Sequence, residues 1–141
     1  MRYHAFISYS HADARWAAWL HRKLESYRLP SRLRGGIGEH GPLPERLSPI
    51  FRDREDLSSA GHLGPQIGQA LADSAALVVV CSPAAVRSPW VDAEIREFKR
   101  LGRGERIYGF IVDGEPETAV MRLGTILPRS DMKPCRRRTS L

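Results

Sequence analysis

The sequence has few cysteines and no long apolar run. Its two cysteines, Cys81 in a predicted strand and Cys135 in the tail, provide neither a disulfide framework nor the ligand spacing of a metal site. No apolar stretch is long enough to cross a bilayer, and the N-terminus lacks the apolar core of a signal peptide. We therefore expect a cytoplasmic protein with no metal and no membrane partner.

Acidic residues are in the minority. Lysine and arginine number 22 against 16 aspartates and glutamates, which gives a formal charge of +6. Such a balance favours solubility and a general attraction to polyanions. The basic residues are spread along the chain and no motif that reads nucleic acid accompanies them, so we expect no specific nucleic-acid partner.

Apolar patterning predicts a single α/β domain. The chain has 141 residues, close to the commonest size of one domain. Short apolar runs predict four strands, over 3–9, 49–52, 77–81 and 107–112. Helical spacing predicts helices between these strands, the second and third starting at Pro65 and Pro89. This alternation predicts a doubly wound parallel sheet of four to five strands with helices on both faces.

The first helix is predicted to start after residue 13 and to end before Pro30. Ser10 or Asp13 is suited to cap its N-terminus. Its aromatic side chains recur at helical steps, and we interpret them as core residues: Trp16, Trp19 and Tyr27.

Two stretches lack periodic apolar residues. Residues 30–47 are rich in glycine and proline and predict an irregular excursion. Residues 117–141 predict an irregular, disordered basic tail, so we assign the folded domain to residues 1–116.

The segment 75–101 contains the strongest candidate site. A continuous apolar strand ends at Cys81, and Ser88 with Pro89 then predicts the start of a helix. Trp90 and Glu94 stand four residues apart on this helix, beside its apolar stripe. Ligands of open α/β sheets bind beyond the carboxyl ends of strands, so Glu94 is a candidate functional carboxylate. From spacing alone a solvated helix glutamate remains an equal alternative, and core packing remains one for Trp90.

Five segments together resemble the bacterial TIR (Toll/interleukin-1 receptor) domain family. They are AFISYSHAD at 5–13, IFRDREDLSSAG at 50–61, ALVVVCSP at 76–83, SPWVDAEI at 88–95 and RIYGFIVDGEP at 106–116. They follow the family's order over most of the chain. The resemblance implies a flavodoxin-like fold, in agreement with the predicted alternation of strands and helices.

The resemblance also implies an activity. Many members of the family cleave NAD at the nicotinamide–ribose bond, with a catalytic glutamate in a Trp-x-x-x-Glu arrangement that Trp90 and Glu94 match. It implies an NAD+ nucleosidase (NAD glycohydrolase or cyclase) that needs no cofactor and acts in signalling or anti-phage defence. The other implied substrate-binding residues are Tyr9, Ser10, His11, Asp53, Gly61 and Leu63, with Trp90 as a wall of the pocket.

A single carboxylate suits this chemistry. Cleavage of a glycosidic bond passes through an oxocarbenium-like state, whose positive charge a carboxylate stabilises. The nicotinamide of NAD already carries a positive charge, so it leaves without a general acid.

A non-catalytic module that pairs with other TIR domains is the alternative function. The loop 53–64 matches the family's usual self-association element. Two departures keep the alternative open: Ser10 and His11 stand where active relatives often carry arginine, and 117–141 shows no clear final strand and helix.

Overall fold

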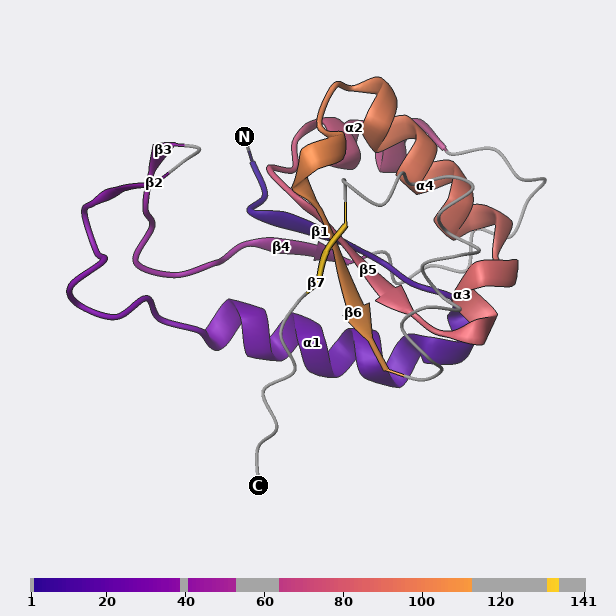
Figure 1. Ribbon diagram of the computed structural model, residues 1–141, viewed down its shortest axis with the longest axis horizontal. Coiled ribbons are helices and arrows are strands. Elements are labelled where there is room, and N and C mark those ends of the chain that lie inside the picture. Colours follow the sequence, from indigo (N-terminus) through magenta and orange to yellow (C-terminus); the bar gives the residue numbers. More distant parts are fainter. Residues whose placement is uncertain (1, 39–40, 53–63, 113–131, 135–141) are drawn as a thin grey trace.

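A parallel sheet of five strands forms the centre of the protein (Figure 1). The computed structural model describes residues 2–38, 41–52 and 64–112, and the backbone of 132–134. The strands are β1 (Ala5–Ser8), β4 (Ile50–Arg52), β5 (Leu77–Cys81), β6 (Ile107–Ile111) and β7 (Met132–Pro134). Their spatial order is β4-β1-β5-β6-β7, which in chain order is the 2-1-3-4-5 arrangement of flavodoxin-like folds. The predicted fold class is confirmed.

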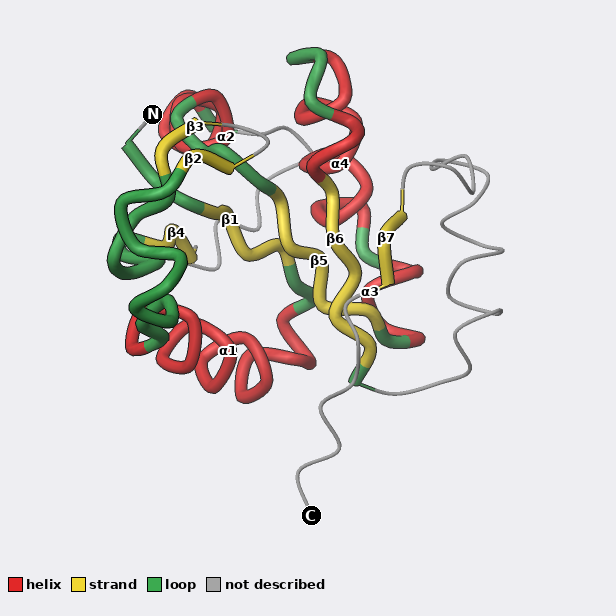
Figure 2. The backbone as a smooth tube through the Cα atoms, turned by 60° about the vertical axis from the view of Figure 1, so that its left-hand side comes forward, coloured by secondary structure: helices red, strands yellow, loops and turns green. Residues whose placement is uncertain are grey.

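Helices cover both faces of the sheet. They are α1 (Ala14–Ser26), α2 (Pro65–Ala72), α3 (Pro83–Arg87) and α4 (Pro89–Arg100), with short 3-10 turns η1 (His11–Asp13) and η2 (Gly104–Arg106). Helix α1 lies on one face, whereas α2 and α4 lie on the other (Figures 1 and 2). Among the helices described, none is both long enough and apolar enough to span a bilayer.

The two faces have separate cores because side chains alternate along each strand. Phe6 and Val79 point toward α2 and α4, while their neighbours Ile7 and Val80 point toward α1. Both faces of β1 and β5 are therefore buried. This double burial explains why these strands are continuously apolar in the sequence.

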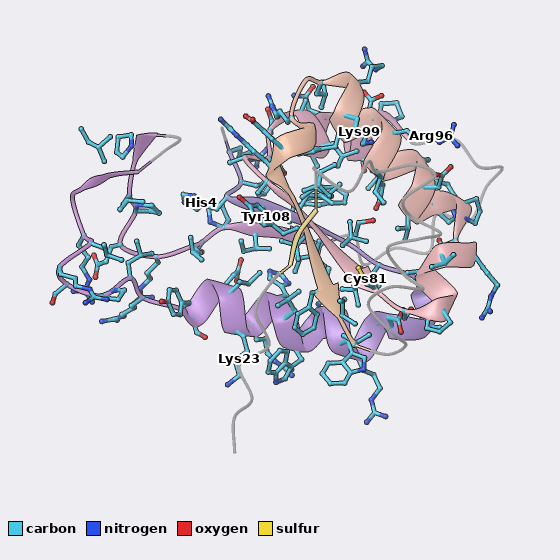
Figure 3. All side chains as sticks on the ribbon, viewed as in Figure 1. His4, Lys23, Cys81, Arg96, Lys99 and Tyr108 are labelled. Carbon is cyan, nitrogen blue, oxygen red and sulfur yellow. The ribbon has the colours of Figure 1, made fainter. Side chains whose placement is uncertain are left out.

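Cys81 ends β5 within the core on the α4 side (Figure 3). Its thiol donates a hydrogen bond to the carbonyl oxygen of Val79 at 3.4 Å. Burial raises the pKa of the Cys81 thiol to about 11, so the thiol stays protonated near neutral pH. A protonated, buried thiol is a packing group and not a nucleophile.

The aromatic residues of α1 do not fill the core, contrary to the sequence-based prediction. Trp16, Trp19 and Tyr27 are 46%, 40% and 46% exposed. The indole of Trp19 stacks on Phe110 of β6, with ring centroids 6.0 Å apart. The buried stripe of α1 contains the smaller Ala17 and Leu20, so the helix lies close to the sheet and the indoles lie along its flank.

Both stretches predicted to be irregular contain strands. Within 30–47, β2 (Ile37–Gly38) pairs antiparallel with β3 (Gly41–Pro42), so the prediction of an irregular excursion is wrong there. Within 117–141, β7 pairs in parallel with β6 and extends the sheet by one strand. The remaining residues of 117–141 lie outside the described residues.

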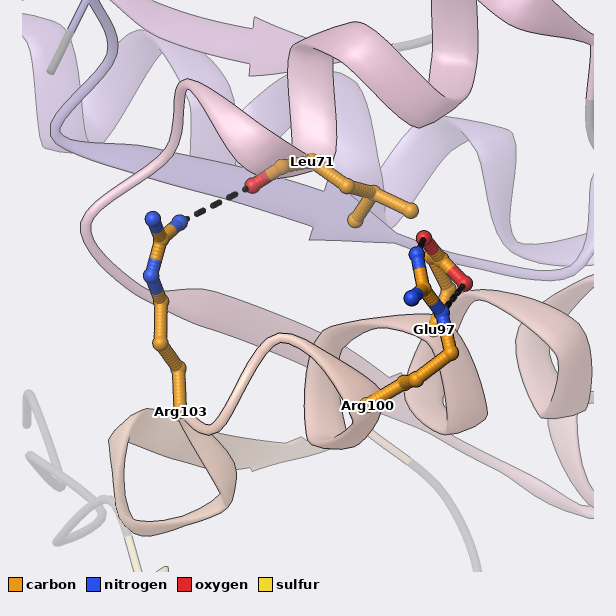
Figure 4. A network of polar contacts seen from close by, with 4 residues as sticks. All are labelled: Leu71, Glu97, Arg100 and Arg103. Carbon is orange, nitrogen blue, oxygen red and sulfur yellow. Dashed lines mark hydrogen bonds and ion pairs between the residues drawn. The ribbon is translucent and has the colours of Figure 1, made fainter.

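Arg103 closes the C-terminal end of α2 (Figure 4). Its guanidinium donates hydrogen bonds to the carbonyl oxygens of Leu71 at 3.5 Å (the contact drawn in Figure 4), Ala72 at 2.7 Å and Ser74 at 3.0 Å. The last carbonyls of a helix have no partner within it, and a cation at this end also balances the helix dipole. Arg103 therefore joins α2 to the turn after α4.

Replacing Arg103 by alanine should lower the free energy of unfolding by about 1–3 kcal/mol, because it leaves partly buried carbonyls unsatisfied. Urea denaturation measures this loss. Arg100→Ala is the matched control, since Arg100 pairs with Glu97 on the exposed side of α4 and such pairs contribute little. Equal losses in the two variants would contradict the role given to Arg103.

Candidate functional site

The candidate site lies where the strand order of the sheet reverses. Strand β4 lies on one side of β1 and β5 lies on the other. Open α/β sheets bind ligands in the crevice beyond the carboxyl ends of the strands at this switch point. The chain after β1 and the chain after β5 both enter this region.

A side-chain hydrogen bond joins these two segments. The hydroxyl of Ser82, the residue after β5, donates to the Oδ2 atom of Asp13 in the turn after β1. Asp13 occupies the N-cap position of α1 but makes no side-chain capping bond there. Ser10, at the start of η1, makes none either. The predicted capping role is therefore wrong for both residues, and Asp13 contacts Ser82 instead.

Two successive Ser-Pro pairs form the start of α3 and the start of α4. The Oγ atom of Ser82 accepts the N–H of Ala85 at 3.1 Å, and that of Ser88 accepts the N–H of Val91 at 3.4 Å. The second cap is the one predicted from the sequence. The first, at Ser82 and Pro83, carries the same Ser-Pro pattern directly after the strand.

Glu94 is buried, which excludes its interpretation as a solvated helix glutamate. It is 7% exposed and lies within the buried stripe of α4, with Val91, Ile95 and Phe98. Glutamate is rarely buried to this extent in proteins, because a charged group loses its hydration there. The sequence predicts Glu94 beside the apolar stripe of this helix, whereas in the structure Glu94 is part of the buried stripe.

The neighbouring carboxylates of α4 are less buried than Glu94, and each is paired with an arginine on the outer side of the helix. Asp92 pairs with Arg96 at 2.9 Å, and Glu97 pairs with Arg100 at 2.6 Å. The hydrogen bond from Arg100 holds the pKa of Glu97 below its ordinary value. Burial thus distinguishes Glu94 from the two acidic residues that the sequence places beside it.

The other candidate residues fall into two groups. Tyr9 and Ser10 are half-buried after β1, His11 is exposed in η1, and Trp90 is half-buried in the first turn of α4. Asp53, Gly61 and Leu63 lie outside the described residues, as does most of the loop 53–64. In the described part of the chain, no group of three or more His, Cys, Asp or Glu side chains is placed to hold a metal ion.

Comparisons with known proteins agree with this architecture. The family model of the TIR domain matches residues 5–129. The chain is also similar to the NAD(+) hydrolase ApTIR of an Actinoplanes species, with 37% identity over 116 residues. That match covers 82% of this chain and 15% of the relative, so the chain spans only a small part of the relative's length. The family match and the order of the sheet lead to one conclusion: this chain belongs to the TIR domain family.

Proposed function

We propose that this TIR domain cleaves NAD at the bond between nicotinamide and ribose. The observation that carries the proposal is the burial of Glu94 on α4, one helical turn after Trp90. The name of the similar Actinoplanes protein, an NAD(+) hydrolase, supports the same substrate. A signalling or anti-phage defence setting is part of the proposal.

In this reaction the C–N bond breaks and its electron pair leaves with nicotinamide, which becomes neutral. The ribose is left with positive charge shared between C1′ and the ring oxygen. The carboxylate of Glu94 stabilises this charge, and its buried position strengthens the interaction because little water screens it. Water then adds to C1′ and loses a proton, which gives ADP-ribose; attack by a group of the ADP-ribose itself would give a cyclic product.

The remaining residues bind the substrate. Trp90 provides an apolar wall next to Glu94 and limits the access of water. Tyr9, Ser10 and His11, at the carboxyl end of β1, contact the rest of the dinucleotide, together with Asp53, Gly61 and Leu63 of the loop 53–64. The imidazole of His11 binds a pyrophosphate less firmly than the permanently charged fork of an arginine, so we expect a modest affinity for NAD.

Release of nicotinamide from NAD by the purified protein tests the proposal. We expect release whose rate per molecule rises with protein concentration if the loop 53–64 mediates self-association. Glu97→Gln serves as a control, because it neutralises a surface carboxylate of the same helix and should leave the rate unchanged. No release at any protein concentration would refute the proposal and favour the non-catalytic interaction module.

A further inference from the structure

Asp13 and Ser82 are 69 residues apart in the sequence and are hydrogen-bonded at the switch point of the sheet. The Ser82 hydroxyl uses both of its hydrogen-bonding directions, since it donates to Asp13 and accepts from the N–H of Ala85. Ser82 is 3% exposed, so water competes little for this hydroxyl. The contact therefore fixes one segment against the other.

Each of the two hydrogen-bonded residues is connected through the backbone to a different part of the candidate site. The backbone N–H of Asp13 donates to the carbonyl of Ser10 at 2.8 Å, which closes the turn that carries His11. From Ser82, helix α3 leads directly to Ser88, whose N–H donates to the carbonyl of Ala85 at 3.1 Å and whose side chain caps α4. The first turn of α4 carries Trp90.

We propose that Asp13 is a positioning residue, whose hydrogen bond with Ser82 holds the turn of Ser10 and His11 in register with α4. The kinetic consequence of this inference rests on the proposed NAD cleavage, whereas the structural consequence does not. Asp13 makes no contact with the substrate in this proposal. It sets the distance between the residues that hold the dinucleotide and the helix that carries Glu94.

The hydroxyl of Ser82 needs an acceptor oxygen at position 13, and the carboxylate of Asp13 provides a strong one. A hydrogen bond to an ionised acceptor is roughly twice as strong as one between neutral groups. Asp13→Asn keeps an acceptor oxygen of the same shape, whereas Asp13→Ala removes it. Loss of the contact should let the turn move by up to about 1 Å. A misplacement of about 1 Å can lower the rate of an enzyme about 100-fold.

We therefore expect Asp13→Ala to raise the KM for NAD about 10- to 100-fold. The value of kcat should change much less, because Trp90 and Glu94 stay on α4. Asp13→Asn should restore most of the affinity. Glu97→Ala, which removes a carboxylate from an exposed pair, should leave both constants unchanged.

A double-mutant cycle tests whether Asp13 acts through Ser82. Ser82→Ala also removes the cap of α3, so it has an effect of its own. Asp13→Ala should add little to the KM of Ser82→Ala, because the bond is already broken. Fully additive effects, or an Asp13→Asn variant as impaired as Asp13→Ala, would overturn the inference.

Hydrogen–deuterium exchange of the peptide covering 9–13 provides a test that needs no activity. Asp13→Ala should accelerate exchange in this peptide, while Asp13→Asn should leave it near the parent's rate. If the parent cleaves no NAD, the proposed function fails and this measurement alone decides the role of Asp13. Exchange that is unchanged in Asp13→Ala would overturn the inference, whatever the activity of the parent.

Discussion

Glu94→Gln should reduce the rate of nicotinamide release by about 100- to 1000-fold, the usual cost of removing one preorganised electrostatic group from an active site. Glutamine keeps the length of the side chain and one acceptor oxygen, but it carries no charge to stabilise the ribosyl cation. The loss should appear in kcat, since the charge acts on the transition state more than on bound NAD. Steady-state kinetics of the parent and the variant measure it.

The same substitution should leave the thermal midpoint within a few degrees of the parent's. Glu94 is buried in the stripe of α4, where an ionised carboxylate is less favourable than in water, and glutamine fills nearly the same volume. Glu97→Gln, on the solvated side of α4, should change neither the midpoint nor the rate. A Glu94→Gln variant as active as the parent would show that Glu94 is not the catalytic carboxylate. A large fall in midpoint would instead assign it a structural role.

Phe98→Ala should lower the free energy of unfolding by about 3–5 kcal/mol, the usual cost of truncating a fully buried phenylalanine. Phe98 is 0% exposed and lies one turn after Glu94 in the same buried stripe. A small domain is stable by only about 5–15 kcal/mol, so this single loss removes a large share of its stability. The proposed activity should fall with it, since α4 holds Glu94 in place.

Urea denaturation of Phe98→Ala and of Trp19→Ala gives a matched comparison. Both variants lose a large aromatic ring, but Trp19 is 40% exposed and stacks on Phe110 at the flank of α1. The loss for Trp19→Ala should be clearly smaller, because less apolar area leaves the interior. Equal losses would contradict the assignment of Phe98 to the core and of Trp19 to its border.

Four of the five strands of the main sheet could be predicted from the sequence because their determinants are local. The strand predicted over 77–81 is observed with those bounds as β5, and α4 begins at Pro89 as predicted. Continuous apolar residues are enough to indicate a strand buried on both faces, and Ser88 with Pro89 is enough to indicate a helix start. The alternation of such elements then leaves few arrangements, of which the doubly wound sheet is one.

For the candidate site, the sequence could indicate which residues stand near the ends of strands and helices, but not how those residues are buried or which of them touch. Sequence patterns alone were sufficient for four of the five strands of the main sheet, most of the helices, the fold class and the placement of Trp90 and Glu94 on one helix. The three-dimensional packing makes Glu94 buried while Asp92 and Glu97 are only half-buried, since burial depends on which side of α4 meets the sheet. It also brought Asp13 to Ser82, a contact across 69 residues that no local pattern encodes. The physical reason is the same in both cases: hydration and hydrogen bonding are set by neighbours in space, and these are distant in the chain.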